Sequence, residues 1–133
     1  MDGKAQAMHA LAARVRGHAH APYSRHQVAA VVRGASGALY AGCNVENAAF
    51  PLGNCAEASA IAAMVTAGEK RIIEALIMGP VGAPCMPCGG CRQRLAEFAD
   101  AAIPVHIADP DRVLRSTTLG ALLPEAFSLR PPP

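Results

Sequence analysis

Two cysteine motifs constrain the fold of this chain more than any other feature. Residues 55–57 read Cys-Ala-Glu, and residues 87–91 read Pro-Cys-Gly-Gly-Cys. Three thiolates can bind a zinc ion and leave its fourth coordination position open for a water molecule. A carboxylate two residues from a ligand can move protons to and from that water. The fold must therefore bring two segments that are distant in the sequence to one point.

Each motif is expected to begin a helix, in a chain that alternates helices and strands. A mixed sheet with helices on its faces follows from this order, which makes the fold class α/β. Asn54 is placed to cap the helix that begins at Cys55, and Gly68 to end it. The expected elements are helix 5–16, strands 27–32 and 38–43, helix 55–67, strand 72–78, helix 90–99, strands 104–108 and 113–117, and a short helix 119–123.

Composition bounds the organisation of the chain and its partners. A length of 133 residues favours a single domain over residues 1–133, with 128–133 as a disordered tail. A 52% share of hydrophobic residues is more than a small domain hides easily, which indicates oligomerisation. A net charge of +2 without a basic run argues against a nucleic-acid partner. No apolar run reaches the length of a membrane span, so we expect a soluble cytoplasmic protein.

The second motif can be read in two registers, because a Pro-Cys-x-x-Cys pattern also pairs Cys85 with Cys88. We prefer Cys88 with Cys91, since only this pair directly precedes a helical run. A structural zinc site with Cys85 or Cys43 as fourth ligand, or a redox Cys-x-x-Cys pair, remains open. Glu57 favours catalysis, because neither alternative needs a carboxylate beside a ligand.

The sequence resembles the small homotetrameric cytidine deaminases in several motifs that follow one another in order. They are Ala-Pro-Tyr-Ser at 21–24, Asn-Val-Glu-Asn-Ala at 44–48, the two cysteine motifs with Arg-Gln at 92–93, and Leu-Leu-Pro at 122–124 with Phe127. The resemblance implies zinc-dependent hydrolysis of cytidine and deoxycytidine to uridine and deoxyuridine in pyrimidine salvage. It also implies a three-layer αβα sandwich around a five-stranded mixed sheet, and a homotetramer with shared active sites.

The resemblance also assigns roles to individual residues. Zinc would be bound by Cys55, Cys88 and Cys91, and Glu57 would shuttle protons. Substrate contacts would come from Asn44 and Glu46 at the ribose, and from His26, Ala56, Phe50 and Phe127. In isolation, Asn44 and Glu46 are better explained as loop caps, and the two Phe residues equally well as core packing.

Two positions depart from the family pattern. His26 stands where relatives commonly have a Phe that stacks on the pyrimidine, and Ala58 stands where many relatives have an Arg. We expect Arg92 to offset the thiolate charge in place of that Arg, although a surface position in the first helical turn is equally reasonable. His26 keeps open an alternative, a blasticidin-type deaminase of a modified cytosine nucleoside. A zinc-stabilised interaction module without catalysis is a further alternative, disfavoured by Glu57.

Overall fold

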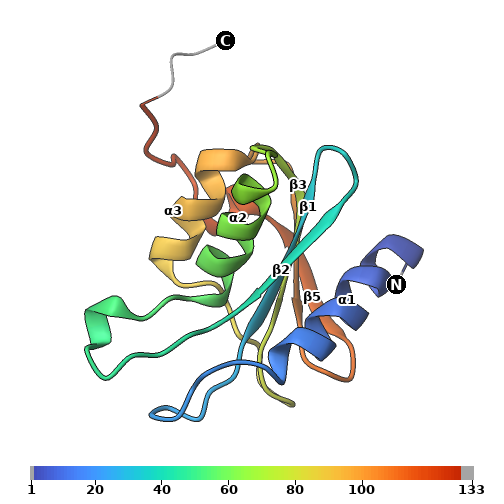
Figure 1. Cartoon of the computed structure of the whole chain (residues 1–133). Coiled ribbons are helices and arrows are strands. Elements are labelled where there is room, and N and C mark those ends of the chain that lie inside the picture. The colour runs from blue at the N-terminus through green and yellow to red at the C-terminus, as the bar shows by residue number, and fades with distance from the viewer. Residues whose placement is uncertain (1, 130–133) are drawn as a thin grey trace.

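A five-stranded mixed sheet lies between two layers of helices in the computed structural model, which describes residues 2–129 (Figure 1). The strand order is β2-β1-β3-β4-β5, and only β3 and β4 pair in parallel. This arrangement confirms the expected three-layer αβα fold. The elements are α1 (Gly3–Arg16), β1 (Ala29–Gly34), β2 (Leu39–Cys43), η1 (Phe50–Leu52), α2 (Ala56–Thr66), β3 (Ile72–Met78), α3 (Gly89–Phe98), β4 (Pro104–Ala108), β5 (Val113–Thr118) and α4 (Leu119–Leu122).

The central strand β1 is buried along its whole length, because both of its faces are covered. Its residues alternate between two apolar cores, as the two-residue period of a strand requires. Ala30 and Val32 face α2 and α3, whereas Ala29 and Val31 face α1. The helices α2 and α3, which begin at the two cysteine motifs, therefore lie on the same face of the sheet (Figure 1).

The helix ends differ from the expected ones for identifiable reasons. α1 begins at Gly3, because the Asp2 side chain accepts a hydrogen bond from the Ala5 N–H at 2.8 Å. The expected capping role of Asn54 is wrong, since Cys55 is the N-cap residue of α2 and Asn54 pairs with Val45 in an isolated bridge. Gly68 follows the end of α2 with a φ of +96°, which fits its expected role there.

Two further expectations concern the ends of the chain and membranes. Of the expected tail 128–133, residues 130–133 lie outside the described residues. Within residues 2–129, no helix combines the length and the apolar character that crossing a membrane requires.

Gly42 on β2 brings α2 unusually close to the sheet. A Cβ atom built on Gly42 would lie 2.4 Å from the backbone nitrogen of Ala60 and 2.6 Å from the Cβ of Ser59. Backbone at this distance cannot move aside without displacing the helix. The absence of a side chain at Gly42 therefore fixes the position of α2, the helix that carries Glu57 in its first turn.

We expect Gly42→Ala to lower the free energy of unfolding by about 1–3 kcal/mol, since overpacking forces a backbone shift. The same shift should lower the activity that the resemblance implies, because it moves Glu57 relative to α3. Urea unfolding and initial rates on the purified variant measure both effects. Gly3→Ala is the matched control, because a Cβ at Gly3 meets nothing within 4 Å. Equal free energies of unfolding for the two variants would show that α2 can move away from β2 without a loss of stability.

Candidate active site

Three thiols meet where α2 and α3 begin. The Sγ atoms of Cys55, Cys88 and Cys91 all lie within 4.8 Å of one another. Cys55 and Cys88 are the N-cap residues of α2 and α3, and Cys91 lies buried in the first turn of α3. This grouping confirms the preferred register of the second motif. Within the described part of the chain, neither Cys85 nor Cys43 belongs to this group.

The donor set of these thiols fits zinc. Thiolate sulfurs around a tetrahedral zinc ion lie about 3.8 Å apart, given zinc–sulfur bonds of about 2.3 Å. Burial raises the pKa of Cys55 and that of Cys91, so both favour the neutral thiol when no cation is near. The backbone N–H of Cys91 lowers the pKa of Cys88. A divalent cation would provide the charge that all three thiolates need in this partly buried position.

Glu57 is buried beside these thiols, with 5% of its surface exposed. Burial raises the pKa of its carboxyl group, while its own backbone N–H, Cys91 and the Arg94 guanidinium act in the opposite direction. A carboxyl group whose pKa is raised from its ordinary value can both accept and donate a proton closer to neutral pH. The site therefore combines three thiols that could hold a metal ion with a carboxyl group that is suited to proton transfer.

The arginine that reaches the thiols is Arg94, not the expected Arg92. Arg94 Nη1 donates a hydrogen bond to Cys91 Sγ at 3.5 Å. Arg92 instead donates from Nε to the carbonyl oxygen of Pro87 and from Nη1 to that of Leu122, both at 2.8 Å. Residues three apart share a helix face, whereas adjacent residues do not. The spacing of three between Cys91 and Arg94 is compatible with this contact, but Arg92 lies four residues after Cys88 and meets the same rule, so the sequence alone does not decide between the two arginines.

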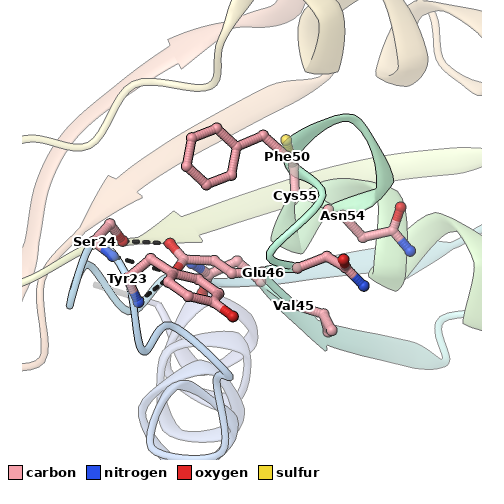
Figure 2. A pocket seen from close by; sticks show the side chains of 10 residues that line it. Tyr23, Ser24, Val45, Glu46, Phe50, Asn54 and Cys55 are labelled. Carbon is pink, nitrogen blue, oxygen red and sulfur yellow. Dashed lines mark hydrogen bonds between the residues drawn. The ribbon is translucent and has the colours of Figure 1, made fainter.

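A cavity of about 550 Å³ opens beside Cys55 (Figure 2). The segment between β2 and α2 forms much of its wall, together with the turn that precedes β1. Its lining residues include Tyr23, Ser24, Asn44, Glu46, Phe50 and Cys55. Polar groups from the loops and one of the three thiols therefore face a common space that is large enough for a small molecule.

Glu46 fixes the turn at Tyr23 and Ser24, as the dashed lines in Figure 2 indicate. Its Oε1 accepts hydrogen bonds from the backbone N–H groups of Tyr23 at 3.0 Å and Ser24 at 3.2 Å, and its Oε2 accepts one from the Ser24 hydroxyl. The Ser24 hydroxyl contributes most to a lowered pKa of Glu46, which keeps the carboxylate ionised.

Asn44 bridges two backbone positions ahead of β1. Its Oδ1 accepts a hydrogen bond from the Val28 N–H at 2.9 Å, and its Nδ2 donates to the His26 carbonyl oxygen at 2.8 Å. Asn44 thus has the loop-fixing role that the sequence left open, while it also lines the cavity.

The remaining predicted substrate residues are not all gathered at the cavity. Phe50 lines it, is 79% exposed and meets the Tyr23 ring edge-on, with ring centroids 6.5 Å apart. Ala56 is buried in the first turn of α2. His26 is exposed, and its Nε2 lies 3.7 Å from Cys85 Sγ. Phe127 is 70% exposed, and its carbonyl oxygen accepts a hydrogen bond from Gln93 of α3.

Comparison with known proteins identifies related sequences and structures. Residues 2–107 match the family described as "Cytidine and deoxycytidylate deaminase zinc-binding region". The chain is 36% identical to a cytidine deaminase of Sporosarcina psychrophila, over 86% of this chain and 85% of the relative. It is 37% identical to a cytidine deaminase of Mycobacterium tuberculosis, over 84% and 80%. The crystal structure of cytidine deaminase from Burkholderia pseudomallei superposes with a TM-score of 0.86 at 35% identity, covering 96% of this chain and 100% of that one.

Proposed function

Because this chain belongs to the cytidine and deoxycytidylate deaminase zinc-binding family, we propose that it hydrolyses cytidine and deoxycytidine to uridine and deoxyuridine in pyrimidine salvage. The observation that carries this proposal is the convergence of Cys55, Cys88 and Cys91 beside the buried carboxyl group of Glu57. The reaction consumes one water molecule and releases ammonia.

The chain's own residues divide the chemistry between binding and proton transfer. Zinc held by Cys55, Cys88 and Cys91 would supply a Lewis acid that acidifies water. Glu57 accepts a proton from the water that attacks C4 of the pyrimidine and passes it to N3. Glu57 then takes the proton of the hydroxyl group that has been added to C4 and delivers it to the amino group, so that the C4–N bond breaks, a C4 carbonyl forms and ammonia leaves. Its burial limits competition from bulk water for these transfers.

Recognition of the sugar is assigned to Asn44 and Glu46. Both line the cavity that begins at Cys55, and the lowered pKa of Glu46 favours a carboxylate that accepts hydrogen bonds from hydroxyl groups. Ala56, at the start of α2, and Phe50, on the cavity wall, complete the proposed substrate contacts of this subunit.

We expect Glu46→Gln to lower kcat/KM for cytidine by about 10- to 100-fold, which corresponds to the loss of a hydrogen bond to a charged group. The loss should come mainly from KM and should be absent for free cytosine, which has no sugar. Ser24→Ala is the matched control, because it removes the hydroxyl that Glu46 holds but keeps the carboxylate. An equal loss of kcat/KM in Ser24→Ala would show that Glu46 only stabilises the turn and does not contact the sugar.

A homotetramer with shared active sites is the proposed assembly. Large apolar side chains are exposed at or near the cavity, with Phe50 at 79%, Leu52 at 71% and Tyr23 at 56% exposure. Exposed apolar surface of this kind is typical of association sites. We propose that the exposed Phe127, whose carbonyl oxygen accepts a hydrogen bond from Gln93 of α3, contributes to the active site of a neighbouring subunit. Light scattering of the purified protein measures the subunit number.

A modified cytosine nucleoside is the second candidate substrate, and the contact between His26 and Cys85 favours it. This pair presents a polar imidazole edge close to the site, where an aromatic ring would be purely apolar. An ultraviolet assay with cytidine, deoxycytidine, free cytosine and modified cytosines separates the two candidates. Zinc stoichiometry in the same samples tests the alternative of a non-catalytic zinc module. We expect activity on cytidine, with one zinc ion per chain, in a cytoplasmic enzyme.

A further inference from the structure

The proposed site concentrates negative charge in a partly buried place. Zinc with three thiolates has a formal charge of −1, and an ionised Glu57 adds a second negative charge beside it. Buried charge is costly unless a partner of opposite sign lies close. Ala58, the residue after Glu57 on α2, has no charge to offer. A cation from another element would lower this cost, in addition to the N-termini of α2 and α3.

Arg94 on α3 is placed to be that cation. Its Nη1 lies 3.5 Å from Cys91 Sγ, within reach of a charge-assisted hydrogen bond to sulfur. A Cβ built at Gly90 would lie in ordinary van der Waals contact with both groups, 3.6 Å from Arg94 Nη1 and 4.0 Å from Cys88 Sγ. The guanidinium group therefore passes over the first turn of α3, on the side where Cys88 and Cys91 present their sulfurs.

Arg92 has a different task. Its hydrogen bonds to the carbonyl oxygens of Pro87 and Leu122 join the loop before α3 to the end of α4. Both contacts are to neutral acceptors, so Arg92 supports the loop that carries Cys88 and does not contact a sulfur through them.

We propose that Arg94 offsets the thiolate charge of this site and thereby sets how tightly the chain retains zinc. Arg94 is a positioning residue, since it acts through Cys91 and not on the substrate. A guanidinium group remains charged at all physiological pH values, so this contribution does not depend on its own titration. The inference rests on the zinc-binding role within the proposed function.

The test is a zinc competition assay on the folded protein, with a chromogenic chelator in excess and no nucleoside present. We expect the affinity of Arg94→Gln for zinc to be about 10- to 100-fold weaker than that of the wild type, as is typical when a residue that supports a metal ligand is replaced. Arg94→Lys should fall between Arg94→Gln and the wild type, because it keeps the charge but loses the planar donor group. Arg14→Gln is the matched control: it removes one exposed positive charge from α1, on the opposite face of the sheet.

A relocation variant sharpens the test. Adding Ala58→Arg to Arg94→Gln places a guanidinium group on α2, directly after Glu57, and we expect it to recover part of the lost affinity. Wild-type zinc affinity in Arg94→Gln, or equal losses in Arg94→Lys and Arg94→Gln, would overturn the inference. Circular dichroism of each variant excludes misfolding as the cause of a loss. Weaker zinc binding in Arg94→Gln without deaminase activity in the wild type would reject the proposed function and leave this inference standing.

Discussion

Glu57→Gln will reduce kcat for cytidine by about 10³- to 10⁴-fold while the protein keeps its zinc, the upper part of the range for loss of a general acid–base group. The amide of Gln has nearly the size of the carboxyl group, so the first turn of α2 should keep its packing. It can neither take a proton from water nor deliver one to the pyrimidine. Because Glu57 is only 5% exposed, bulk solvent offers little replacement for this function.

Three measurements on the same sample decide this prediction: steady-state rates on cytidine, zinc content and thermal unfolding. A loss in kcat with little change in KM indicates an interaction made in the transition state. Asp100→Asn is the matched control, since it neutralises an exposed carboxylate that pairs with Arg71 and follows α3 at the end opposite to Cys88. If Glu57→Gln kept more than about a tenth of the wild-type kcat, Glu57 would not be the residue that transfers the protons.

The grouping of the metal ligands was predictable because it follows from local rules. Cys55 and Cys88 directly precede segments with clear helical patterns, and they are the N-cap residues of α2 and α3. Only the shared metal requires the two helix ends to meet. The sequence alone therefore favours Cys91 over Cys85 as a ligand.

Other features depend on packing that the sequence does not express. The strand order β2-β1-β3-β4-β5 results from long-range pairing, and local patterns do not determine it. Asn54 has the right residue type for a cap, but its pairing with Val45 draws it away from the helix end. Arg92 and Arg94 are equally plausible by composition. Only the rotation of the helix from Cys91 decides which of them reaches the sulfur.

The structural contacts of Asn44 and Glu46 are compatible with the substrate contacts proposed for them. The Asn44 amide forms hydrogen bonds with the backbone of residues 26 and 28, and the Glu46 carboxylate accepts hydrogen bonds from the turn at Tyr23 and Ser24. Asn44 Oδ1 and Glu46 Oε2 each accept one of these hydrogen bonds and can accept a further one, whereas Glu46 Oε1 already accepts two. Anchored side chains also hold their remaining acceptors in fixed directions, which favours binding of a small polar ligand.

Removal of zinc should abolish deamination and leave the fold in place. The two apolar cores on the faces of the sheet contain large buried side chains such as Leu76, Ile77 and Leu95, which pack without any metal ligand. We expect the metal-free protein to keep its far-ultraviolet circular dichroism and to unfold at a lower temperature. The difference in stability arises because a ligand that binds only the folded state stabilises it by mass action. Activity should return when zinc is added.

The pH dependence of zinc binding has a defined sign. Zinc requires the thiolate forms, and burial raises the pKa of both Cys55 and Cys91, so binding must displace protons from these two thiols. Zinc affinity should therefore fall as the pH is lowered, and zinc addition to the metal-free protein should release protons into weakly buffered solution. Competition with a chelator at several pH values measures this trend.

Two outcomes of zinc removal would contradict the proposed role of the metal. If the metal-free protein were unfolded, the zinc site would be structural, and if the metal-free protein remained active, zinc would have no part in the reaction. The buried cores argue against the first outcome, and the placement of Glu57 beside the three thiols argues against the second.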